Sequence, residues 1–307
     1  MRIVSLLPAA TEIIALLGQL DHLVGISHEC DFPAEVNSLP RVTHCPLYDA
    51  GLSSAEIDRR VREALATDGT LYRMNEPLLR ELRPDFILTQ QLCDVCAVGY
   101  GSVAALAANL PIRPILVNLE PKCLADIFEN IRHIGEALGL KERAEAANTD
   151  LAKRVAAVRT KAAEVGRRPK VFLMEWIDPP FCSGHWGPEL VKLAGGEEIF
   201  GRHGERSVQV PWEDVIAAQP EVIVLACCGY KPQRTLQDFP ILQQLSGWND
   251  LSAVNQGRVY VVDGNAYFHR PGPRIVDSLE ILAEIIHPEL FGGMFPDRGV
   301  VRLEKSA

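Results

Sequence analysis

The sequence predicts an α/β protein with two Rossmann-like lobes, each built on a mainly parallel sheet, joined by a single long backbone helix. Three observations support this fold class. Short apolar stretches alternate with amphipathic helical stretches along the 307 residues. The strand candidates fall into two groups on either side of a long helical region. The length of 307 residues is sufficient for two domains, each with its own core.

Seven stretches predict strands because they are short, rich in β-branched residues and apolar on both faces, and because turn or polar residues follow them. They are residues 3–7, 23–27, 86–90 and 115–119 in the first group, and 170–176, 222–227 and 258–264 in the second. Strands that are apolar on both faces are typical of parallel sheets covered by helices.

The same connection from helix to strand occurs once in each group. The stretches LRELRPDFILTQ (79–90) and IAAQPEVIVLAC (216–227) both end a helix, stop it with proline, continue with an acidic residue and begin an apolar strand. This repetition predicts two α/β lobes.

A long helix is predicted in residues 140–169, where small and apolar side chains recur every three or four residues. They are Ala144, Ala147, Leu151, Val155, Val158, Ala162 and Val165, with Gly166 and Pro169 ending the helix. About 26 residues at 1.5 Å each give about 39 Å, the width of a small domain. The narrow stripe suits packing across two lobes, and an ordinary surface helix is the alternative. We therefore expect an N-terminal lobe at 1–120, a helical connection at 121–168 and a C-terminal lobe at 169–307.

The first twenty residues, MRIVSLLPAATEIIALLGQL, contain an apolar stretch, but Pro8, Thr11 and Glu12 interrupt it and no cleavage site follows. They predict a strand, a turn and a helix, so we expect a cytoplasmic protein. A periplasmic protein whose true start lies upstream is the alternative. No window approaches 18 consecutive apolar residues, so we expect no membrane insertion.

Charge and cysteine usage narrow the function classes. The net charge of −9 argues against nucleic acid as a partner, because phosphates require a basic face. Eight cysteines in a chain without a recognised export signal are expected to be reduced thiols or metal ligands.

Cysteine, histidine and aromatic residues gather in the segments that follow the predicted strands. Ligands of such sheets bind beyond the carboxyl ends of the strands, so these segments are expected to face a cleft between the lobes. Seven of the eight cysteines fall there, and Cys123 is the exception.

Thiolate and imidazole groups bind Zn, Fe or Co, and imidazole is a frequent axial ligand of a metal in a macrocycle. The candidate metal ligands are His28, Cys30, His44, Cys45, Cys93, Cys96 and His185. Cys93 and Cys96 have the spacing of half a zinc site, but there is no second CxxC pair. Lining of the cleft is the favoured role for this pair, with structural zinc and redox chemistry as alternatives.

Aromatic residues in these segments offer flat apolar walls for a large ligand. The candidates are Tyr100, Trp186, Trp212, Tyr230 and Tyr267, together with Phe268. The sequence has no GxxxxGK[ST], GxGxxG, HExxH or GxSxG motif, and we find no nucleophile–base arrangement. We therefore expect a binding protein and not an enzyme.

Four blocks that span nearly the whole chain in order resemble the class III periplasmic binding proteins of ABC importers, which bind iron-siderophores and cobalamin. The blocks are IVSLLPAATEIIALLGQLDHLVGISHECDFP, VFLMEWIDPPFCSGHWGPELVKLAGGEEIF, VPWEDVIAAQPEVIVL and FHRPGPRIVDSLEILAEII. The resemblance is greatest to the cobalamin-binding branch. Residues 44–75 depart from it, because they replace a shorter segment that carries a ligand-stacking tryptophan in the family.

The resemblance implies roles for single residues. Phe181 and Trp212 match residues that line the ligand site, and Glu29 takes the place of a ligand-contacting tyrosine. His269 falls where the cobalamin-binding branch has a glutamate near the ligand. Glu213 matches an acidic residue that docks onto arginines of the importer, a role that would lapse in a cytoplasmic protein.

The expected function is the binding of a metal chelate, cobalamin or another corrinoid first, between the two lobes. An ABC importer permease is the partner that the resemblance implies. The alternatives are an iron-siderophore or haem-binding importer component, and a cytoplasmic metal-binding enzyme or metallochaperone for cofactor salvage that uses the Cys/His-rich cleft.

Overall fold

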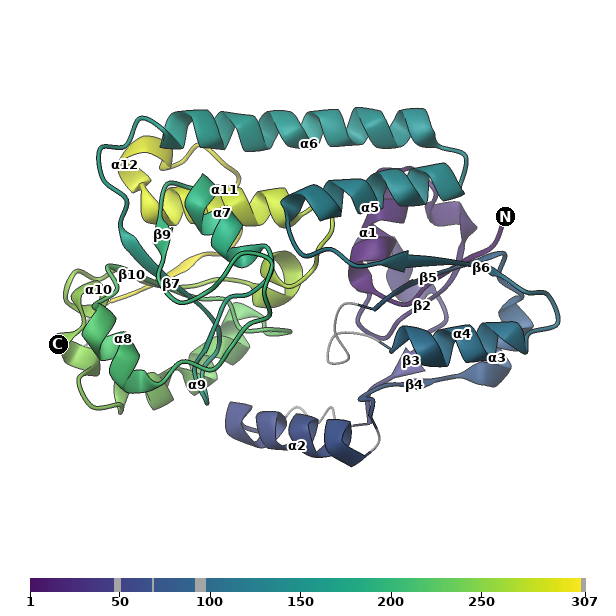
Figure 1. Ribbon diagram of the computed structural model, residues 1–307, viewed down its shortest axis with the longest axis horizontal. Helices are drawn as coiled ribbons and strands as arrows, with labels where there is room; N and C mark the ends of the chain where they lie inside the picture. The colour runs from purple at the N-terminus through teal and green to yellow at the C-terminus, as the bar shows by residue number, and fades with distance from the viewer. Residues whose placement is uncertain (47–50, 68, 92–97, 305–307) are drawn as a thin grey trace. The chain divides into compact units, whose positions relative to one another are not determined.

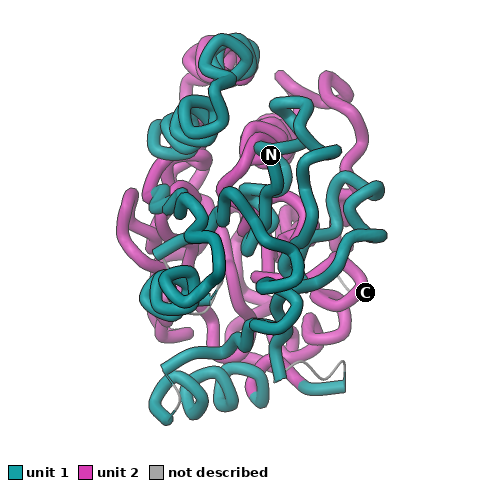
Figure 2. The backbone as a smooth tube through the Cα atoms, turned by 90° about the vertical axis from the view of Figure 1, so that its right-hand side faces the viewer, with its two compact units in different colours: residues 1–52, 56–121, 125–150 teal, residues 53–55, 122–124, 151–307 magenta. Residues whose placement is uncertain are grey.

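The computed structural model describes residues 1–46, 51–67, 69–91 and 98–304, which form two compact units (Figure 2). The first unit contains Met1–Leu52, Glu56–Pro121 and Ala125–Asp150, and the second contains Ser53–Ala55, Lys122–Leu124 and Leu151–Ala307. The helical stretch that we assigned to a separate connection at 121–168 is thus shared between the two units.

The first unit is built on a parallel sheet with the strand order β2-β1-β5-β6 (Figure 1). These strands are β1 (Ile3–Ser5), β2 (Leu23–Ile26), β5 (Phe86–Gln90) and β6 (Ile115–Leu119). Its helices are α1 (Pro8–Leu16), α3 (Glu76–Leu82), α4 (Tyr100–Ala108) and α5 (Leu124–Ala137). The four strands predicted for the N-terminal half are confirmed, and β1, β2 and β5 bury apolar side chains on both faces of the sheet, whereas the edge strand β6 buries only Val117 and Leu119.

The described residues within 44–75, where the chain departs from the family resemblance, lie outside this sheet. The strand β3 (Thr43–His44) pairs antiparallel with β4 (Arg73–Met74), and α2 (Ser54–Thr67) lies between them in sequence. Charged pairs cover the exposed face of α2, where Arg59 bonds to both Glu56 and Glu63.

The second unit has a mixed sheet with the order β12-β11-β10-β7-β8, and β9 also pairs with β7. The strands are β7 (Lys170–Trp176), β8 (Phe181–Cys182), β9 (Glu197–Glu198), β10 (Val222–Leu225), β11 (Val259–Val261) and β12 (Val301–Leu303). The three predicted strands β7, β10 and β11 form its parallel centre. The predicted class, α/β with mainly parallel sheets, is confirmed, although β8 and β12 are antiparallel.

Helices surround this second sheet, and α7 packs against the almost entirely buried α11 (Figure 1). The helices are α7 (Gly187–Leu193), α8 (Trp212–Ala218), α9 (Pro232–Gln243), α10 (Ser252–Asn255), α11 (Ile275–Ile286) and α12 (Pro288–Phe291). Single turns of 3-10 or π helix lie at Leu20–His22, Ala34–Ser38, Trp248–Asp250 and Gly264–Phe268.

The predicted long helix is α6 (Lys141–Ala162), which has 22 residues and continues from the first unit into the second. It ends a few residues before Gly166, so it is shorter than expected. Its buried side chains include Ala144, Leu151, Val158 and Ala162, all of which belong to the predicted stripe.

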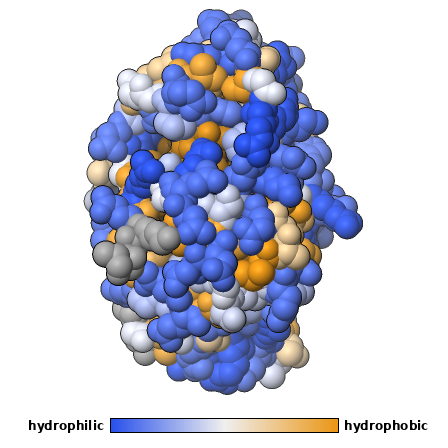
Figure 3. All heavy atoms as spheres, turned by 90° about the vertical axis from the view of Figure 1, so that its left-hand side faces the viewer, coloured by the Kyte–Doolittle hydropathy of each residue, from blue (hydrophilic) through white to orange (hydrophobic). Residues whose placement is uncertain are grey.

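Among the described residues, no helix combines the length and the apolar character that crossing a membrane requires. The face of the molecule in Figure 3 is mostly hydrophilic, and its hydrophobic side chains lie in small separate groups.

Candidate functional site

The carboxyl ends of β7, β10 and β11 bring several chemically active side chains together in the second unit. Glu175 and Trp176 end β7, the Cys227–Tyr230 turn follows β10, and the turn of π helix at Gly264–Phe268 follows β11. Gly264 allows two of these segments to meet, because a Cβ atom there would lie 2.1 Å from the carbonyl oxygen of Cys227. The local sequence thus fixes the edge of the sheet where ligands of this fold class bind.

Glu175 and His269 form the polar centre of this edge. The amide of Gly184 donates to Oε1 of Glu175 at 3.0 Å. Burial raises the pKa of Glu175, and the nearby charge of His269 opposes that rise. The Nε2 atom of His269 donates to the carbonyl oxygen of Ala226, which fixes the orientation of the ring.

His185 is the second imidazole here, and its backbone adopts φ +51°, an uncommon conformation for a residue with a side chain. Two hydrogen bonds hold it: its amide donates to Glu205 at 2.6 Å, and its carbonyl accepts from Gly204 at 2.9 Å. Burial lowers the pKa of His185, assisted by the charges of Arg206, Lys122 and His269. The ring is therefore neutral at pH 7 and has a lone pair for a metal.

Aromatic side chains and cations contact one another at the same edge of the sheet. The rings of Trp176 and Tyr230 lie 4.9 Å apart, and the guanidinium of Arg234 lies 4.5 Å from the centre of the Tyr230 ring. Tyr267 is half-buried under Arg274, and burial raises the pKa of its phenol. Tyr230 is buried at 7% exposure, so the half-buried Trp176 and Tyr267 are the rings here that can face a large planar ligand.

The other aromatic candidates of the second unit differ in how deeply their side chains are buried. Trp186 is buried, and its indole N–H donates to the carbonyl of Phe268 at 2.9 Å. Trp212 stacks on Trp248 at 6.1 Å and donates to Ser246. Phe181 is half-buried on β8. Trp186 is thus a packing residue beneath the turn Gly264–Phe268, whereas Phe181 and Trp212 keep some exposed surface.

In the first unit, His28 and Cys30 follow β2 and are held by neighbouring polar groups. The Nδ1 atom of His28 lies 2.8 Å from the hydroxyl of Thr43, and Nε2 lies 3.2 Å from Glu29. The Cys30 thiol is 1% exposed and contacts the hydroxyls of Thr11 and Ser27 at 3.1 and 3.2 Å. Cys30 therefore has the environment of a core thiol.

The remaining candidates of the first unit lie at different depths. His44 is exposed on β3, Cys45 is half-buried beyond it, and Tyr100 is half-buried at the first position of α4. Cys93 and Cys96 lie outside the described residues.

Two cysteines at the edge of the second sheet have the properties of packing residues. Burial raises the pKa of the Cys227 thiol to about 12 and that of Cys182 to about 11. Both remain protonated at neutral pH, and a protonated thiol is a poor metal ligand.

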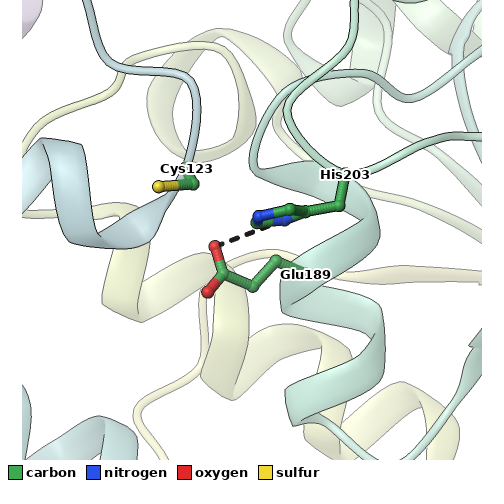
Figure 4. Close-up of side chains that lie close together, drawn as sticks. All are labelled: Cys123, Glu189 and His203. Carbon is green, nitrogen blue, oxygen red and sulfur yellow. Dashed lines mark ion pairs between the residues drawn. The ribbon is translucent and has the colours of Figure 1, made fainter.

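Within the described ranges, the structure brings together one group of three or more potential metal ligands, and none of its members was predicted to bind metal. The group is Cys123, Glu189 and His203, all of the second unit (Figure 4). Cys123 was not predicted to bind metal, because it lies outside the segments that were expected to face the cleft. Glu175 was also missed, although an acidic residue at the end of an apolar strand is a recognisable signal.

Comparisons with known proteins place the chain among binding proteins. The family described as periplasmic binding protein matches residues 79–266. An uncharacterized ABC transporter substrate-binding lipoprotein of Bacillus subtilis is 23% identical over 94% of this chain and 81% of that protein. The vitamin B12-binding protein of Vibrio cholerae is 24% identical over 91% of this chain and 86% of that protein. The periplasmic haem-binding protein RhuT from Roseiflexus sp. RS-1 superposes with a TM-score of 0.69 at 22% identity, covering 94% and 98% of the two chains.

These comparisons correct the expected location. The prediction of a cytoplasmic protein is wrong, because the matching family and its relatives are periplasmic or lipoprotein substrate-binding proteins, which indicates a location outside the cytoplasm. The strand and helix expected at the N-terminus are present as β1 and α1. A folded beginning of the first sheet carries no information about export.

Proposed function

Because this chain belongs to the periplasmic binding protein family, we propose that it binds a metal chelate and delivers it to an ABC importer. Cobalamin or another corrinoid is the first candidate ligand. The observation that carries the proposal is similarity over 91% of the chain to vitamin B12-binding proteins. The haem-binding structural neighbours make haem the second candidate.

The edge of the second sheet supplies chemistry that fits such a ligand. A corrinoid or haem presents a broad face of more than one ring, and the half-buried Tyr267 and Phe181 offer aromatic surface for it. A neutral His185, or Nδ1 of His269, can approach the metal of the macrocycle. Binding would therefore combine aromatic burial of the macrocycle with one imidazole.

In the first unit, Glu29 and Tyr100 are the proposed ligand contacts. Glu29 lies beside His28 in the turn after β2, where the resemblance predicts a ligand-contacting loop. A carboxylate in this position favours hydrogen bonding to amide or hydroxyl groups on the rim of the chelate, in place of stacking on its face.

Because the comparisons indicate a location outside the cytoplasm, Glu213 is again a candidate for docking onto arginines of the importer. It is exposed in the first turn of α8, together with Asp214. An exposed carboxylate there can pair with an arginine of a permease and contribute mainly to the rate and specificity of docking.

The known members of the family are substrate-binding proteins, so we propose binding and not catalysis as the function. The titratable groups at the edge of the second sheet, Glu175, His185 and His269, then serve to recognise a ligand and not to convert it.

The test is an absorbance titration of the purified chain with cyanocobalamin, haem and a ferric siderophore. The proposal expects one equivalent of cobalamin or haem to bind, with a change in the ligand spectrum. No spectral change and no thermal stabilisation with any of the three would refute it.

Two variants connect this binding to the proposed residues. Tyr267→Ala should weaken binding at least tenfold, whereas Phe295→Ala should leave it unchanged, because Phe295 stacks on Phe291 after α12. His185→Ala should alter the spectrum of the bound ligand if this imidazole approaches the metal. Equal affinity of Tyr267→Ala and wild type would contradict the proposed position of the ligand.

A further inference from the structure

Three potential metal ligands from separate segments of the second unit lie close together (Figure 4). Cys123 lies in the short segment Lys122–Leu124, Glu189 lies in the first turn of α7, and His203 lies in the turn after Gly201. Their donor atoms all lie within 4.8 Å of one another.

The distances approach those of a tetrahedral metal site. Zinc bonds of about 2.0–2.3 Å place neighbouring ligand atoms about 3.3–3.6 Å apart. Nδ1 of His203 lies 3.8 Å from Oε2 of Glu189, so this pair requires only a small adjustment. His203 is 57% exposed, and its side chain has the space to make that adjustment.

The carboxylate of Glu189 is already oriented by a hydrogen bond. The amide of Leu124 donates to Oε2 of Glu189 at 2.8 Å. This bond joins the segment that carries Cys123 to the helix that carries Glu189, and it holds the two ligands in one place. Supporting hydrogen bonds of this kind orient the ligands in known metal sites.

Positively charged side chains near Glu189 and His203 affect how favourably a metal cation can bind there. Glu189 and His203 also line a cavity of about 770 Å³, together with Arg159, Arg168 and Lys192. These cations disfavour a bare cation, so binding depends on the two negative charges of the Cys123 thiolate and the Glu189 carboxylate. Because Glu189 and His203 line this cavity, water can reach both side chains.

We propose that Cys123, Glu189 and His203 form a binding site for a divalent transition metal ion of the Zn²⁺ class, with water as the fourth ligand. One sulfur, one nitrogen and one oxygen donor suit Zn²⁺ or Co²⁺ better than Mg²⁺ or Ca²⁺, which prefer oxygen ligands. This site takes a bare ion and is separate from the residues proposed to bind the chelate. The ion would fasten the Lys122–Leu124 segment to α7.

The experiment is a Co²⁺ titration of the full chain, reduced and stripped of metal, followed by displacement with Zn²⁺. We expect one Co²⁺ per chain with a thiolate-to-metal charge-transfer band that Zn²⁺ abolishes. Cys123→Ser should remove the band, and His203→Gln should weaken Co²⁺ binding at least tenfold. Because His203 is exposed, His203→Gln is expected to fold normally, which circular dichroism verifies.

A control variant separates this site from the other thiols. Cys228→Ser removes an exposed thiol outside the group. It should retain the band and the affinity of wild type. The proposal is overturned if Cys123→Ser keeps the band, if His203→Gln binds Co²⁺ as tightly as wild type, or if Cys228→Ser abolishes binding.

Thiol alkylation gives an independent readout. Zn²⁺ should slow the modification of Cys123 by iodoacetamide at least fivefold, measured by mass spectrometry, and should leave the rate at Cys228 unchanged. An unchanged rate at Cys123 would also overturn the proposal.

Discussion

Replacing Glu280 with glutamine should destabilise the second unit, because Glu280 is the centre of a buried ion network. Its carboxylate is 6% exposed and accepts from Nε of Arg154 at 2.8 Å and from the guanidinium of Arg298 at 2.6 Å. Asp277 on the same helix, α11, accepts from both arginines. The variant therefore leaves two guanidinium groups facing a single carboxylate.

The expected loss follows from the burial of each partner. Breaking a buried ion pair by removing one charge costs about 3–5 kcal/mol. Arg154 is 37% exposed and can turn toward water, whereas Arg298 is 9% exposed and cannot. We therefore expect the lower end, about 3 kcal/mol, which for a unit of this size lowers Tm by about 6–12 °C.

Tryptophan fluorescence during urea unfolding at pH 7 is a suitable assay, because all four tryptophans belong to the second unit. Glu284→Gln, one turn further along α11 and outside the network, is the matched control and should change the free energy of unfolding by less than about 0.5 kcal/mol. A Glu280→Gln variant as stable as wild type, or a control that loses as much, would refute the reasoning.

Three further predictions concern the second unit. Phe172→Ala should cost about 3–5 kcal/mol in urea unfolding, because the ring is fully buried against Phe200, and a loss below 1 kcal/mol would contradict its place in the core. Gly264→Ala should cost about 2–3 kcal/mol, since its Cβ would meet the Cys227 carbonyl, whereas Gly166→Ala, in open space and without a left-handed backbone, is expected to cost less. Burial raises the pKa of Glu198 to about 7, so the folded state keeps its proton where the unfolded state has lost it. The stability of wild type relative to Glu198→Gln should therefore be highest below pH 4.5 and fall by about 3 kcal/mol as the pH rises to about 7.5, and a flat difference across this range would rule out the raised pKa.

The central strands were predictable because a parallel strand buries both faces and leaves a continuous apolar stretch in the sequence. All four residues of β10, Val222–Leu225, are fully buried. The strands β8, β9 and β12 were missed for the opposite reason. They have two or three residues each and lie at the margins of the sheet, where one face is exposed and no periodic pattern develops.

The thiols show why the site was harder to predict than the fold. Cys30 and Cys227 follow strands β2 and β10 as expected, whereas Cys182 lies inside the short strand β8. Position at the end of a strand could not distinguish a ligand from a packing residue, because the hydroxyls around Cys30 and the burial of Cys227 arise from tertiary contacts. The ligand roles of the predicted residues remain predictions that binding experiments must test.

The group of Cys123, Glu189 and His203 illustrates the limit of reading positions along the chain. Glu189 and His203 lie on either side of β9, and Cys123 lies 66 residues before Glu189, in a segment that joins the second unit although its neighbours on both sides belong to the first. No spacing rule connects residues that meet through such a crossover. What joins them is one backbone hydrogen bond, from Leu124 to Glu189, which a carboxylate in the first turn of α7 is placed to accept. A metal ion at this point would strengthen a connection that the fold already makes.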